Sequence, residues 1–211
     1  MEASTMMTLK AFNEHVLKGK SIKELYSLIE DFKIEKIFLK VQIERKNIAA
    51  FTLPPAEMLS KINSYRLYIS DTYKKIEKLG GTVERADDEE FALKFQENLS
   101  NIHEISYQIG DQFGKKEEFN LVFEESGMIN DAINKEAFLK EFSELYIGEW
   151  RESYLASDYG DQVMAGTSWA LNIHFTNEMP AVQFGGTNAY PYNFGLFDRL
   201  IKKDFHEKQT N

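Results

Sequence analysis

The sequence contains no cysteine. This absence excludes disulfide bonds, thiolate nucleophiles and cysteine-ligated zinc or iron–sulfur sites, and it is typical of a reducing compartment. No apolar run approaches the ~20 residues that a membrane-spanning helix needs. The first twelve residues, MEASTMMTLKAF, also lack the basic segment followed by an apolar one that marks a secretory signal. We therefore expect a cytoplasmic protein with no membrane partner.

Motifs that carry enzyme chemistry are also missing. The sequence has no G-x-x-x-x-G-K-[ST] or G-x-G-x-x-G phosphate loop and no G-x-S-x-G nucleophile elbow. The four histidines are far apart and form no H-x-x-x-H pair: His15, His103, His174 and His206. We therefore assign no metal, no cofactor and no catalytic residue. The alternative is general acid–base cleavage of RNA by His174 with Glu149 or Asp161, although an exposed histidine on a strand is more often simply solvated.

Negative charge is concentrated in the middle of the chain. The net charge of the 211 residues is −9, yet residues 1–80 hold 14 Lys+Arg against 10 Asp+Glu, and residues 81–160 hold 7 against 19. This asymmetry disfavours direct nucleic-acid binding, which needs a basic face, and it suits a basic protein or ribonucleoprotein partner. The alternative is an acidic face that serves only solubility.

Residues 1–114 are predicted to form a helical bundle. The sequence SIKE at 21–24 is a capping box, which predicts a helix from about residue 22 to residue 50, before the prolines of LPP. A second apolar stripe runs from Ile62 to Leu79 at steps of three and four and ends at Gly80. A third stripe runs from Phe91 to Phe113. We predict that the last two stripes pack as a long antiparallel αα-hairpin.

The acidic sequence ADDEE precedes the third stripe. Carboxylates at a helix N-terminus are favoured by the helix dipole, so a capping role is the simplest interpretation. In the binding hypothesis the same side chains form part of the partner surface: Asp87, Asp88, Glu89 and Glu90.

The remaining chain turns toward β structure, so the predicted fold class is α+β. A connecting segment at 115–145 holds one weak strand, EFNLVFEE, and a short helix, NKEAFLKEFSELY. Residues 146–211 are predicted to form a small ββ(β)α domain, in which SWALNIHF and AVQF are antiparallel strands and YIGEWRESYL supplies a third. The helix NFGLFDRLIKKDF closes this small sheet.

The sequence GGTNAYPYNF at 185–194 connects the return strand to this closing helix. The two glycines allow a positive φ or a bulge, Pro191 holds Tyr190 extended, and Asn193 is the natural N-cap. A purely structural role is therefore available. The alternative is a contact surface for a partner, made by Asn188, Tyr190, Tyr192 and Asn193.

A resemblance is carried by the spacing GT-x-W-x-L-x-I followed by G-x-NAYP-x-NF. The matching residues are Gly166, Thr167, Trp169, Leu171, Ile173, Gly186, Asn188, Ala189, Tyr190, Pro191, Asn193 and Phe194. Across residues 146–205 the chain is similar to a C-terminal domain of uncharacterised proteins from plasmids, phages and integrative elements of Gram-positive bacteria. Small accessory proteins of such elements include inhibitors of host defence, anti-CRISPR proteins among them. The resemblance thus implies a bacterial host and an inhibitor, with a Cas9-type nuclease as one candidate partner.

Three functional hypotheses remain open at this stage. The first is a non-catalytic protein- or ribonucleoprotein-binding inhibitor that acts through its acidic surface. The second is an enzyme that cleaves a guide RNA. The third is a structural or dimerisation module, because long aromatic helices can pair between chains to give a homodimer.

Overall fold

A computed structural model describes residues 6–45, 53–160 and 166–206. The chain divides into two compact units, Met1–Arg85 and Ala86–Asn211, each of which is described by itself. The first is helical, and the second combines a sheet with helices, so the α+β prediction is confirmed. The predicted boundary at residue 114 differs from this division, because residues 102–111 belong to the sheet of the second unit.

The N-terminal unit contains helices α1 (Leu9–His15), α2 (Ile22–Glu44) and α3 (Pro55–Lys78). The predicted capping box is confirmed at α2: Ser21 Oγ accepts from the Glu24 N–H, and the Glu24 carboxylate accepts from the Ser21 N–H at 2.8 Å. Helix α2 ends at Glu44, and the last part of the predicted helix, 46–50, lies outside the described residues. Helix α3 begins at Pro55, where a missing N–H costs no hydrogen bond.

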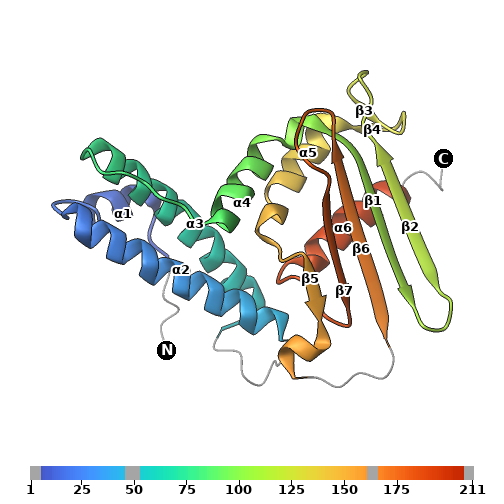
Figure 1. Cartoon of the computed structure of the whole chain (residues 1–211), viewed down its shortest axis with the longest axis horizontal. Helices are drawn as coiled ribbons and strands as arrows, with labels where there is room; N and C mark the ends of the chain where they lie inside the picture. Colours follow the sequence, from blue (N-terminus) through green and yellow to red (C-terminus); the bar gives the residue numbers. More distant parts are fainter. Residues whose placement is uncertain (1–5, 46–52, 161–165, 207–211) are drawn as a thin grey trace. The chain divides into compact units, whose positions relative to one another are not determined.

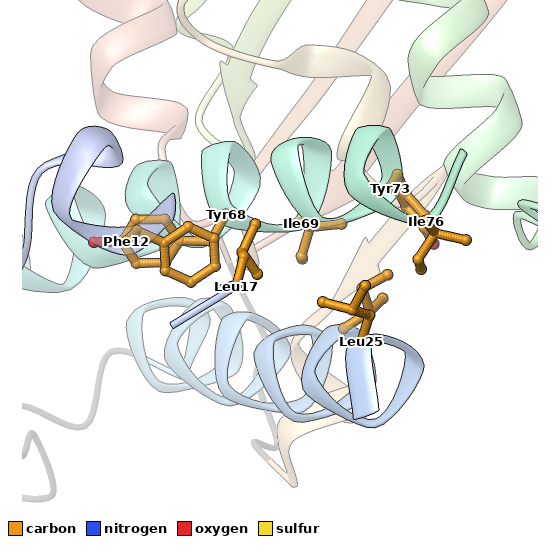
Figure 2. Close-up of a cluster of buried hydrophobic side chains, with 8 residues drawn as sticks. Phe12, Leu17, Leu25, Tyr68, Ile69, Tyr73 and Ile76 are labelled. Carbon is orange, nitrogen blue, oxygen red and sulfur yellow. The ribbon is translucent and has the colours of Figure 1, made fainter. Parts of the chain in front are cut away.

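The core of this unit lies between α2 and α3, with α1 at one end (Figure 2). Phe12 of α1 stacks on Tyr68 with ring centroids 4.1 Å apart, and Phe32 of α2 lies 5.6 Å from Tyr68. At the other end of α3, Ile76 lies beside Leu25 (Figure 2). Because the early part of α2 meets the late part of α3, the two helices are antiparallel. The long αα-hairpin of this fold is therefore α2 with α3.

The C-terminal unit is built on a five-stranded sheet (Figure 1). Its elements are, in chain order, α4 (Asp87–Glu97), η2 (Leu99–Asn101), β1 (Ile102–Asp111), β2 (Lys116–Val122), β3 (Met128–Ile129), β4 (Ile133–Asn134), α5 (Lys135–Ser143), η3 (Ile147–Glu149), β5 (Ser153–Leu155), η4 (Ala156–Tyr159), β6 (Thr167–Phe175), β7 (Val182–Thr187) and α6 (Phe194–His206). The strand order is β2-β1-β6-β7-β5. Neighbouring strands are antiparallel except β5 and β7, which are parallel. Strands β3 and β4 form a separate two-stranded ribbon.

The predicted helix from Phe91 to Phe113 is wrong beyond residue 97. Helix α4 ends at Glu97, and residues 102–111 form strand β1, which pairs with both β2 and β6. Phe113 lies in the turn between β1 and β2 and is 85% exposed, so it is not part of a helical seam. The hairpin of the Ile62–Leu79 stripe with this segment is wrong for the same reason. Two long ladders of backbone hydrogen bonds outweigh the local helical spacing.

The other strand predictions are largely confirmed. Strands β6 and β7 cover SWALNIHF and most of the predicted return strand, and β2 covers the first five residues of the weak strand EFNLVFEE. The strand expected at 146–155 is shorter, because η3 occupies its first part and only Ser153–Leu155 pairs with the sheet. Helix α6 crosses one face of the sheet (Figure 1), where Phe197 packs 5.1 Å from the ring of Tyr107. The core is therefore aromatic.

Candidate functional site

The segment after β7 fits closely against the start of β6. Asn188 adopts a left-handed backbone with φ of 57°. Its Oδ1 accepts from the Thr167 N–H at 2.8 Å. A Cβ on Gly166 would lie 1.6 Å from this same oxygen, so no larger residue fits there without moving Asn188. Gly166 and Asn188 are thus two halves of one structural contact.

The indole of Trp169 fixes the next part of this segment. Its Nε1–H donates to the Ala189 carbonyl at 2.8 Å, and the bond is buried. A Cβ on Gly186 would lie 2.6 Å from the same Nε1, which explains a glycine at this position. The ring of Tyr190 stacks parallel to Trp169 with centroids 6.4 Å apart. The motif residues are therefore explained by packing around one tryptophan.

Asn193 is buried and links the start of α6 to the residues on either side of η3. Its Oδ1 accepts from the Trp150 Nε1–H at 2.8 Å, and its Nδ2 donates to the Leu145 carbonyl at 2.6 Å. Its backbone carbonyl accepts from the Leu196 N–H at the start of α6. Asn193 therefore stands at the predicted capping position, but its side chain is used in the core. Tyr192 is also buried, so the predicted contact surface is corrected at these two residues.

The four acidic side chains predicted to bind a partner lie in the first turn of α4. Asp87, Asp88 and Glu90 are exposed, and Glu89 is half-buried. The N-cap residue of this helix, Ala86, offers no side-chain acceptor, so carboxylates next to the free N–H groups favour the helix start. Within the described part of the chain, no Lys or Arg pairs with Asp87, Asp88 or Glu90.

The structure describes two of the three alternative catalytic residues, His174 and Glu149. His174 is exposed on β6 and stands opposite Glu104 of β1. Glu149 lies in η3, and Asp161 lies outside the described residues. No hydrogen bond joins His174 to Glu149 in the described ranges. Across the same ranges, no three His, Asp or Glu side chains gather in a way that would hold a metal ion.

The described helices include none that is long and apolar enough to cross a membrane.

An open cavity of about 700 Å³ lies on the C-terminal unit, at the end of the sheet where β1 turns into β2. Its lining includes Gln108 of β1, Ser168 of β6 and Thr187 of β7, together with Lys116 of β2. The Ser168 and Thr187 hydroxyls lie 3.3 Å apart. This lining offers hydrogen-bond donors and acceptors. Sequence reasoning missed Gln108, because it placed that residue on a helix rather than on the outer face of a strand.

A charged network ties α6 to the hairpin of β1 and β2. The hydroxyl of Tyr107 donates to Asp198 at 2.8 Å, and Lys202 lies 3.1 Å from Asp198 and 2.9 Å from Glu117. Burial, helped by the bond to Asp198, raises the pKa of the Tyr107 phenol. The hydrogen bond from Lys202 lowers the pKa of Glu117. These groups are paired with one another, so the network braces the unit.

Comparison with known proteins finds no matching family model, no matching curated protein and no matching solved structure.

Proposed function

We propose that this chain is a non-catalytic binding protein whose C-terminal unit engages a basic protein or ribonucleoprotein surface. The observation that supports this proposal is the division of charge between the units. Residues 1–85 hold 15 Lys+Arg and 11 Asp+Glu, whereas residues 86–211 hold 10 and 23. Such a field attracts a basic partner over distances of about one Debye length, ~10 Å at 0.1 M salt. The partner surface is centred on the first turn of α4.

The electrostatics of α4 favour this choice of surface. Asp87, Asp88 and Glu90 are exposed, and no cation of the described chain neutralises them. Elsewhere in the unit several carboxylates are already paired, for example Glu117 with Lys202 and Asp158 with Arg151. Carboxylates that lack an internal cation keep their charge available for an external one. By the resemblance to mobile-element proteins, the specific partner we propose is a bacterial defence nuclease, and the outcome of binding is its inhibition.

The test compares two variants with the same change in net charge. The surface variant carries Asp87→Asn, Asp88→Asn, Glu89→Gln and Glu90→Gln. The control neutralises four exposed acids elsewhere in the same unit: Glu125→Gln, Glu136→Gln, Glu144→Gln and Glu152→Gln. Binding to a purified Cas9-type ribonucleoprotein is measured at several salt concentrations. We expect the surface variant to lose affinity at least about 10-fold, and the control about 3-fold or less.

Cleavage of target DNA and integrity of the guide RNA are followed in the same samples. Lost DNA cleavage with intact RNA supports inhibition by occlusion. Degraded guide RNA supports the enzyme hypothesis instead. Poly-L-lysine serves as a generic basic probe: equal weakening by both variants would contradict the α4 surface, and no binding to the nuclease complex would contradict the inhibitor assignment.

A further inference from the structure

The outward side of α2 carries an apolar stripe that the N-terminal unit does not use. Ile34 is 63% exposed, Ile37 is 57% exposed and Phe38 is 52% exposed. Their spacing of three and four residues places them on one side of the helix, and Val41 continues the same stripe. Large contiguous apolar patches are rare on soluble proteins and mark places where another surface binds.

This stripe is distinct from the core side of the same helix. Leu25 and Ile29 are buried in the core of the unit, and Leu39 is also buried. Helix α2 is therefore apolar on two sides, of which only one is covered within the described residues. A helix that needs only one partner is apolar along one stripe, so the second stripe calls for an additional surface.

Charged residues bracket the stripe on the same side. At ~100° per residue, Glu30 and Arg45 fall within about 60° of the direction of Ile34. Both are exposed. The face thus carries a negative charge at one end, apolar side chains in the middle and a positive charge at the other end. Two copies of this face therefore match when their helices run in opposite directions, because the negative end of each copy then meets the positive end of the other.

We propose that this face, from Glu30 to Arg45, is a homodimer interface in which two copies of α2 pack antiparallel. A two-fold axis between residues 37 and 38 places Ile37 against Phe38 of the second copy and Ile34 against Val41. The same axis places Glu30 against Arg45 of the second copy, twice by symmetry. A parallel pair would place like charges together. The occupant that this charge order fits is therefore a second copy of the chain.

Disulfide trapping tests the register directly. The chain has no cysteine, so only introduced thiols can react. The variants are Ile34→Cys and Val41→Cys, made separately and mixed. In the proposed register a mixture of the two forms a covalent dimer under mild oxidation, whereas each alone does not, because identical positions lie ~10 Å apart along the axis and a disulfide needs Cα atoms within about 7 Å. Cross-linking of the single variants alone, or none in the mixture, overturns the register.

Sedimentation of the full chain up to about 200 μM tests the energetics. We expect Glu30→Arg and Arg45→Glu each to weaken the dimer roughly 5-fold, and the double variant to return within about 2-fold of the wild type. The double variant Ile37→Glu with Phe38→Glu places four carboxylates at the two-fold axis, two from each copy, and should weaken the affinity of the dimer about 100-fold or more.

The control is Leu67→Glu, a 49% exposed position on α3. It should leave the dimer unchanged, and circular dichroism confirms that every variant folds. A monomeric wild type over the whole range, a double charge variant that stays weak, or dissociation by Leu67→Glu would each overturn the proposal.

Discussion

Replacing Asn193 with leucine should destabilise the C-terminal unit by about 2–6 kcal/mol. This magnitude follows from the two hydrogen bonds of the Asn193 side-chain amide, which accepts from the Trp150 indole and donates to the Leu145 carbonyl. Leucine has a similar volume but no polar atom, so both partners stay buried without a hydrogen bond. Each buried group left unsatisfied costs about 1–3 kcal/mol. Packing changes are small by comparison, because the shape is nearly retained.

Urea unfolding followed by tryptophan fluorescence measures this loss. The chain has two tryptophans, Trp150 and Trp169, and both lie in this unit with ring centroids 6.1 Å apart. Gln183→Leu is the control, because it also replaces a side-chain amide with leucine, at an exposed position of β7. Its effect should be about 0.5 kcal/mol or less. Asn193→Leu and Gln183→Leu with equal midpoints and equal slopes would refute the reasoning.

The change Asn193→Asp adds a pH dependence with a defined sign. Aspartate keeps an acceptor for Trp150, but when ionised it cannot donate to the Leu145 carbonyl. Burial and this carbonyl therefore raise its pKa in the folded state above the ordinary ~3.9. A raised carboxyl pKa gives stability that is present below the unfolded pKa and lost as pH rises through the folded pKa. The variant should be closest to the wild type near pH 4 and weakest above pH 7. A deficit that is constant from pH 4 to 8 would contradict this.

Two further predictions concern the same unit. Gly166→Ala should destabilise the unit by about 2 kcal/mol or more, because the new Cβ would lie 1.6 Å from Asn188 Oδ1. Gly195→Ala in α6 is the control: its Cβ would meet nothing within 4 Å, so it should be neutral or stabilise by up to ~1 kcal/mol. Thermal unfolding of the two variants distinguishes the signs. Tyr107→Phe should cost about 1–2 kcal/mol at pH 7 by removing the donor to Asp198. Because the wild-type pKa is raised, the stability that Tyr107 contributes is lost above pH ~10, so the deficit of the variant should shrink there, which alkaline urea titrations can measure.

Local chemistry in the sequence predicts the helical half of the fold well. The capping box of Ser21 and Glu24, the start of α3 at Pro55 and the glycine after its end all depend on neighbouring residues alone. Strand β6 was also predictable, since Trp169, Leu171 and Ile173 alternate with polar residues. In each case the residues that form the sequence pattern are the same residues, or near neighbours of the residues, whose structure it predicts.

Strand β1 was missed because its sequence satisfies two periods at once. Ile102, Ile105 and Ile109 keep a helical spacing, while Ile105, Tyr107 and Ile109 alternate with polar residues as in a strand. The choice between the periods depends on β6, which is distant in the sequence. The strand wins because β2 and β6 pair along both of its edges.

The exposure of the residues expected to contact a partner could be predicted only in part. The exposed turn of α4 follows from its acidic sequence. The burial of Tyr192 and Asn193 does not follow, because it depends on Trp150 and Leu145, which approach from another part of the chain. Polar residues in a loop predict an exposed position only when no buried polar group from a distant part of the chain forms hydrogen bonds with them.

The central place of β1 in the sheet has a consequence for how the protein is made. Its partner β6 leaves the ribosome only after the whole stretch from Gln112 to Gly166 has been translated, which takes several seconds at roughly 5–20 residues per second. Until then β1 can pair only with β2, which follows it directly in the chain, and its other edge has no partner strand. An unpaired strand edge is a site where chains can aggregate, so chains that end before β6 should aggregate more readily than the full chain.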